Sequence, residues 1–150
     1  MKNRLLHACL ALAFITCLTA VPALCAQESK KKAEETELGK SMEKISGAWR
    51  KLRRQVADPA SNVASLELVA TIQTAAQKAL TLTPTRIEDV PAADRGKFAE
   101  HYQQGIKGFL DQVGRLAEAL KAGDNAAAQE LVKKIGDLQK AGHREFKRPD

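Results

Sequence analysis

The sequence predicts an all-α protein, an antiparallel four-helix bundle with up-down-up-down topology. Apolar residues recur every three or four positions through four long segments, which is the spacing of one helix face. Proline, glycine and aspartate separate these segments, two of the links being short and one long. The sequence has no alternating strand pattern, no internal repeat and no glycine-rich phosphate loop.

The four expected helices form one domain over residues 37–148. Their expected ranges are Glu37–Ala57, Ser61–Leu82, Asp94–Ala122 and Asp124–Lys147, and the one long link is Thr83–Ala93. The stripes expected to face the core are Leu38, Met42, Ile45, Trp49, Leu52 and Val56; then Leu66, Val69, Ile72, Ala76 and Leu80; then Phe98, Tyr102, Ile106, Phe109, Val113, Leu116 and Leu120; and finally Ala128, Leu131, Ile135, Leu138, Gly142 and Phe146.

The first 26 residues have the features of a cleaved secretory signal peptide. The start is positively charged, residues 5–20 are apolar, and small residues lead up to Ala26. We expect cleavage after Ala26, with Ala23 as the alternative, and a flexible polar lead-in over residues 27–36. The apolar run is shorter than the roughly 20 residues of a spanning helix, so we expect an exported chain without stable membrane insertion.

This leader contains all the cysteines of the chain, Cys9, Cys17 and Cys25. The mature chain is therefore expected to have no disulfide, no thiolate metal site and no thioether-linked haem. Removing Lys2 and Arg4 with the leader lowers the formal net charge from +6 to +4. So mild a basic charge does not by itself identify a class of partner.

One methionine and one histidine are the candidates for chemistry. After leader removal Met42 is the only methionine, and His101 and His143 are the only histidines. In an up-down bundle the start of the first helix and the finish of the last lie at the same end, so Met42 and His143 are expected to face one cavity. Thioether sulfur and imidazole nitrogen together bind haem iron in electron carriers. The alternative is that Met42 packs in the core and His143 lies at its boundary.

Four patches of the sequence resemble the cytochrome b562 family, periplasmic four-helix haem proteins, and the resemblance covers nearly all of Glu37–Lys147. The patches are Leu38–Ile45 (LGKSMEKI), Thr83–Asp89 (TPTRIED), Tyr102–Ile106 (YQQGI) and Ala141–Lys147 (AGHREFK). The resemblance implies a one-electron carrier in the periplasm, with Met42 and His143 as axial ligands of the haem iron. Two family positions that line the haem pocket fall on Tyr102 and Ile106, and isoleucine departs from the aromatic residue expected at the second.

The absence of cysteines decides which haem this resemblance implies. Gln139 and Gly142 stand where a C-x-x-C-H motif ending at His143 would have its thiols. We therefore expect one non-covalent haem b per chain, in a monomer that exchanges electrons with an unidentified periplasmic redox protein. Nucleic acid is not an expected partner, and no residue constellation for an enzyme is present.

Several alternatives remain open at this stage. The chain could be a haem-free helical bundle that acts as a periplasmic binding or stress-linked interaction protein, or a haem store without an electron partner. His101 could compete as a ligand, although its neighbours favour a solvated face. The basic run Arg50–Arg54 is either an ordinary solvated face or a docking patch for an acidic redox partner.

Overall fold

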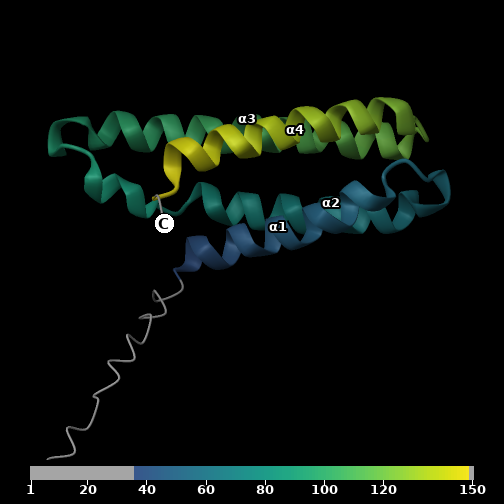
Figure 1. Cartoon of the computed structure of the whole chain (residues 1–150), viewed down its shortest axis with the longest axis horizontal. Coiled ribbons are helices and arrows are strands. Elements are labelled where there is room, and N and C mark those ends of the chain that lie inside the picture. Colours follow the sequence, from purple (N-terminus) through teal and green to yellow (C-terminus); the bar gives the residue numbers. More distant parts are fainter. Residues whose placement is uncertain (1–35, 149–150) are drawn as a thin grey trace, which may run out of the picture. The chain divides into compact units, whose positions relative to one another are not determined.

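The computed structural model describes residues 36–148, so the predicted leader and nearly all of the lead-in lie outside the described residues. This part of the chain lies within one compact unit and is all-helical, with four α-helices and no strand in the described residues (Figure 1). The helices are α1 (Glu37–Gln55), α2 (Asn62–Leu80), α3 (Arg95–Lys121) and α4 (Asn125–Phe146). Across residues 36–148, no helix combines the length and apolar character needed to cross a membrane.

Polar side chains fix where the helices begin. The Thr36 hydroxyl accepts a hydrogen bond from the Gly39 amide at 3.0 Å, and the Asp124 carboxylate accepts one from Ala127 at 2.9 Å. Each bond satisfies an amide that has no partner within the first helical turn. Gly123, with φ of 73°, makes the tight turn between α3 and α4 that the sequence predicts at this point.

Two of the predicted ranges are too long, and the long link is more ordered than expected. The first helix ends at Gln55 instead of Ala57, because Asp58 caps a short 3₁₀ helix at Pro59–Ser61 before α2 begins at Asn62. The second helix ends at Leu80 instead of Leu82. The link then contains 3₁₀ helices at Thr85–Asp89 and Ala92–Asp94, each preceded by a proline.

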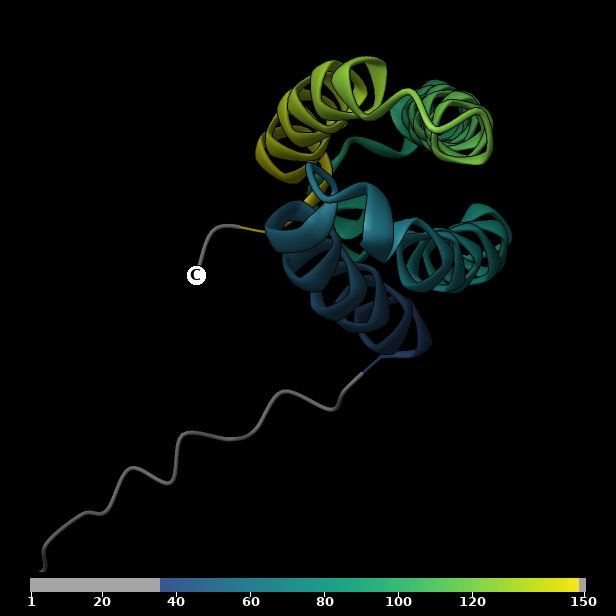
Figure 2. The same ribbon diagram turned by 90° about the vertical axis from the view of Figure 1, so that its right-hand side faces the viewer.

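The packing between consecutive helices is extensive, whereas the backbones of α1 and α4 lie further apart. Helix α1 packs on α2, α2 on α3 and α3 on α4, as expected for a four-helix bundle. Figure 2, in which the helices are viewed nearly end-on, shows α3 and α4 as one pair and α1 and α2 as the other. The core lies between the middle turns, where the largest fully buried side chains include Leu52, Ile72, Leu116, Leu120 and Ile135.

The predicted core stripes are confirmed in part. In α4, Val132 is buried instead of Leu131, which packs against the core from a half-buried position. In α2, the small residues Ala75 and Ala79 are buried while Leu66 and Leu80 are half-buried. Alanine lets α2 approach its neighbours closely, so its longer side chains lie at the edges of the contact.

A buried amide ties the α1–α2 and α3–α4 links together. The Asn125 side-chain NH₂ donates to the Val56 carbonyl and to the Asn62 side-chain oxygen, both at 2.8 Å. Asn125 is 8 % exposed, so these bonds are shielded from water. These hydrogen bonds join the start of α4 to the end of α1 and the start of α2, far from the start of α1.

Candidate functional site

A cavity of about 570 Å³ lies at the end of the bundle where α1 begins and α4 finishes. Its walls come from α1, α3, α4 and the start of the long link. The apolar side chains that line it include Leu38, Met42, Ile45, Ile106, Phe109, Leu138 and Phe146. A mostly apolar pocket of this size falls within the range of small-molecule and cofactor sites, roughly 300–1,000 Å³.

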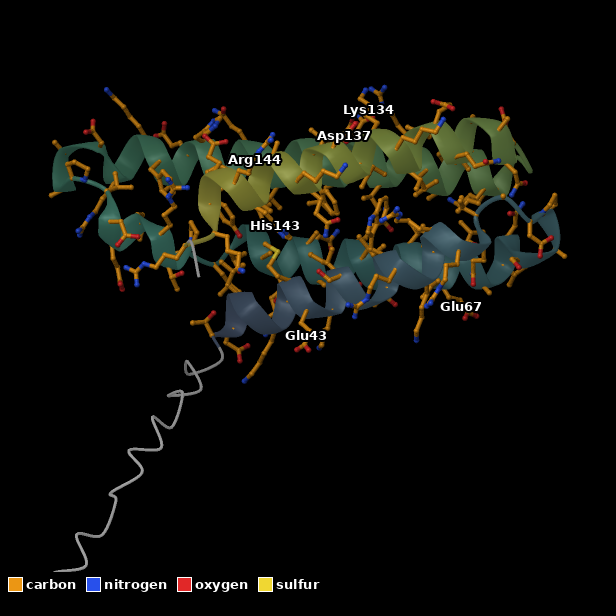
Figure 3. The ribbon with its side chains drawn as sticks, in the orientation of Figure 1. Glu43, Glu67, Lys134, Asp137, His143 and Arg144 are labelled. Atoms are coloured by element: carbon orange, nitrogen blue, oxygen red, sulfur yellow. The ribbon has the colours of Figure 1, made fainter. Side chains whose placement is uncertain are left out.

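Met42 and His143 both line this cavity, one from the second turn of α1 and one from the last turns of α4. Met42 is half-buried and packs against the core, whereas His143 is exposed. Figure 3 shows His143 on the side of α4 that faces α1. The sequence predicted that His143 faces a cavity, and the structure has its side chain in the cavity lining. Its exposure is explained by this position, because the cavity has no packed neighbour to cover the imidazole.

Leu138 is also more exposed than its place on the predicted inward stripe suggests. It is 39 % exposed and is one of only two large hydrophobic side chains in residues 36–148 classed as exposed. It lies in the cavity wall one turn before Gly142. An aliphatic side chain left open in a concave wall indicates a surface that a ligand can cover.

Tyr102 and Ile106 line the cavity from successive turns of α3. The Tyr102 hydroxyl donates a 2.9 Å hydrogen bond to the Ala79 carbonyl at the end of α2, which holds the ring in place. Burial raises the pKa of Tyr102 to about 12, because the charged phenolate would lose its hydration. Ile106 is half-buried and provides an aliphatic wall.

Phe146 is a major part of the cavity wall, although the sequence identified it only as a core residue. Its ring lies against three others, with centroid distances of 5.4 Å to Phe98, 5.6 Å to His101 and 5.3 Å to Tyr102. A Cβ atom added to Gly105 would lie 3.5 Å from the Phe146 ring, which is an ordinary van der Waals contact, so the two helices pack closely at this point. The aromatic cluster fixes the last turn of α4 against the start of α3.

His101 lines the same cavity but its ring is already engaged. Its Nε2 atom lies 2.8 Å from the Glu145 carboxylate, and the His101 side chain is 57 % exposed. The solvated position expected for His101 is therefore confirmed. This contact adds a second link between α3 and the turn of α4 that carries His143.

Two arginines hold the finish of α4 against the 3₁₀ helix at Thr85–Asp89. Arg86 donates to the carbonyl oxygens of Arg144 and Glu145, each at 2.7 Å. Arg148 donates to the carboxylates of Asp89 and Glu88 at 2.9 Å, and these bonds raise its pKa. The last carbonyls of a helix have no partner within the helix, so Arg86 stabilises the end of α4 directly.

The sequence did not reveal these contacts of Arg86 and Arg148, which are here called the clamp. The donors and acceptors lie 58 to 60 positions apart, which leaves no local pattern to detect. The only signal in the sequence is that Arg86 and His143 each lie in one of the four patches on which the family resemblance rests. The clamp matters for the site because it positions the helix turn on which His143 is carried.

The residues present fit a flat apolar ligand with a metal at its centre. Small residues in the cavity walls are Gly39, Ser46, Gly105 and Gly142. Thioether sulfur and imidazole nitrogen are suitable donors for haem iron. Within residues 36–148, no group of three or more His, Cys, Asp or Glu side chains offers an alternative site for a metal ion.

Comparison with known proteins adds one finding. The family model described as cytochrome b562 matches residues 37–147, which is most of the chain. No curated protein matches the sequence.

Proposed function

Because the chain belongs to the cytochrome b562 family, whose members are b-type haem proteins of electron transfer, we propose that it is a one-electron carrier using Met42 and His143 as axial ligands. The observation that carries the proposal is that both side chains line the same cavity, although they stand near opposite ends of the described chain. When bound, the haem would supply an iron that is oxidised and reduced by one electron.

Each residue of the cavity has a role in this proposal. Met42 would hold the haem iron through its thioether sulfur, which favours reduced iron, and His143 would hold it through an imidazole nitrogen. With both donors supplied by the chain, the group would serve electron transfer in preference to oxygen chemistry. Tyr102, Ile106 and Phe146 cover the apolar ring system and exclude water from it.

The proposal extends to the whole mature chain. We take the topology to be up-down-up-down, supported by the packing of each helix on the next. One haem b binds each monomer without a covalent bond, since no cysteine follows residue 25. The periplasm is the proposed location, supported by the typical location of the family and by the signal peptide predicted over residues 1–26. A periplasmic redox protein would supply or accept the electron.

An absorption spectrum of the protein reconstituted with haem, oxidised and then reduced, tests the proposal. We expect the sharp bands of low-spin, six-coordinate iron, and quenching of the buried Trp49 fluorescence. In Met42→Ala the reduced six-coordinate spectrum is lost while the helical circular dichroism remains. The matched control His101→Ala keeps the spectrum, because the His101 ring is held by Glu145. A colourless wild-type protein, or an unchanged spectrum in Met42→Ala, would contradict the proposal.

A further inference from the structure

Helix α1 carries a group of exposed cations that the bundle does not neutralise. We propose that this group, here called the α1 cationic face, docks an acidic protein with which the chain exchanges electrons, an inference that rests on the proposed function. The face consists of Lys44, Arg50, Lys51, Arg53 and Arg54, all of them exposed.

The α1 cationic face stands out within residues 36–148 because its unpaired cations lie close together in the sequence, whereas on α3 and α4 unpaired cations such as Lys107 and Lys134 alternate with paired ones. In the described part of the chain, ion pairs engage Lys78 on α2, Arg115 and Lys121 on α3, and Lys133 and Lys140 on α4. None of the five side chains of the α1 cationic face makes an ion pair or hydrogen bond with residues 36–148. From residue 44 to residue 57 the sequence contains no Asp or Glu. The repulsion among the five cations of the α1 cationic face is therefore screened only by solvent, or by a partner of opposite charge.

The α1 cationic face continues directly from the mouth of the cavity. Ser46 lines the cavity, and Arg50 is one helical turn further along the same side of α1, about 6 Å at 1.5 Å per residue. A typical partner covers roughly 800 Å² of each surface, a disc about 30 Å across. A protein centred on Arg50 would thus also reach Met42, about 12 Å away along the axis of α1, and with it part of the cavity mouth.

The chemistry of the face favours carboxylates on a protein. Three of its five members are arginines, whose planar guanidinium groups bind carboxylates with paired hydrogen bonds. Binding to a lipid surface usually requires exposed aromatic or aliphatic side chains beside the cations. On α1 the aromatic Trp49 is 4 % exposed and Leu52 is 0 % exposed, so both are turned into the core.

Two carboxylates limit where an acidic partner can lie. Figure 3 shows Glu43 and Glu67 pointing away from α3 and α4, toward the same side of the molecule as the outer surface of α1. Neither makes an ion pair with residues 36–148. Glu43 also lines the cavity and lies about 10 Å along α1 from Arg50, inside the area that the partner would cover. The partner's carboxylates would therefore lie over Arg50–Arg54, and the part of the partner over Glu43 would carry none.

Poly-L-glutamate is a suitable probe, because it presents carboxylates on a polypeptide. We expect its addition to shift the amide NMR signals of residues 44–54 more than those of α3 or α4, with binding that weakens steeply as salt is added. The double variant Arg50→Glu/Arg54→Glu should weaken binding by roughly tenfold or more. The control variant Lys107→Glu/Lys134→Glu changes the net charge equally, using unpaired exposed lysines of α3 and α4, and should weaken it by less than about twofold.

Three results would overturn the inference. These are equal losses in the two double variants, NMR shifts spread over all helices, or tighter binding to vesicles of mixed phosphatidylcholine and phosphatidylglycerol than to the polypeptide. The measurement is made on the chain with and without haem. Binding by the haem-free chain separates this inference from the proposed function, whose failure would appear only as a missing haem spectrum.

Discussion

The two ends of the bundle differ in how far they bury the same kind of apolar stripe. Away from the cavity, Leu52 and Leu116 are fully buried and Leu120 is 2 % exposed. At the cavity end, Ile106 is half-buried and Leu138 is 39 % exposed, although both lie on stripes of equal periodicity. One end thus completes its own core, whereas the other leaves a lined space of about 570 Å³. The difference indicates that the second end gains its full burial only with a ligand.

The largest expected effect comes from removing a side chain of the closed end. Leu116→Ala should lower the free energy of unfolding of the haem-free protein by about 3 kcal/mol, because it leaves a void among close-packed neighbours. Ile106→Ala should cost less than about 1 kcal/mol, since that side chain already borders a cavity. Urea unfolding measures both. Equal losses would show that the cavity end is packed as tightly as the closed end.

A smaller effect is expected from releasing the finish of α4. Arg86→Met removes the two 2.7 Å hydrogen bonds to the Arg144 and Glu145 carbonyls, and should lower the free energy of unfolding by about 1 kcal/mol. It should also weaken haem binding several-fold, because the turn carrying His143 loses its support. Urea unfolding and haem titration measure the two changes.

The control for this variant is Arg115→Met, which removes only an exposed pair with Asp111. It should change the free energy of unfolding by about 0.5 kcal/mol or less and leave haem binding unaltered. If Arg86→Met behaves like this control, the clamp does not position the cavity end of α4.

The last expected effect is a pH dependence that appears only in alkaline solution, and it concerns Tyr102. Its pKa is raised from the ordinary 10.0 to about 12, so between these pH values the folded chain keeps a proton that the unfolded chain has lost. The free energy of unfolding should therefore fall as pH rises from about 10 toward 12, and this contribution is fully present below pH 10. Tyr102 is the only tyrosine, so the ultraviolet absorbance of tyrosinate reports its titration directly.

Tyr102→Phe is the control for this pH dependence, because it removes the titrating hydroxyl and keeps the ring. As pH rises over the same range, the urea concentration at the midpoint of unfolding should fall less for Tyr102→Phe than for the wild type. A tyrosinate midpoint near 10 would show that the phenol is open to water, and hence that the cavity end is looser than the structure describes.

The sequence predicted the four helices well because each depends on local information. Periodicity identified which side of α3 turns inward, and Asp124 and Gly123 marked the turn into α4. Periodicity cannot tell whether two inward faces touch. It therefore placed Leu138 toward a core, where the structure leaves that side chain exposed in the cavity wall. That both candidate ligands would share one space followed from topology, and their role as ligands stays a prediction.

The sequence pattern could not predict contacts between segments that are far apart in the chain. The amide of Asn125 is buried and donates to the Val56 carbonyl. Arg86, in the long link, donates to carbonyl oxygens at the end of α4. Each depends on an acceptor almost 60 or more positions away, and neither residue type at such a position implies a particular partner.

The cavity draws part of its wall from the last helix of the chain, α4, and the rest from α1, α3 and the long link. A polypeptide cut short before α4 therefore lacks His143 and one side of the cavity. Under the proposed function such a fragment would not hold haem as the whole chain does, so the colour of a preparation would report its fraction of full-length molecules.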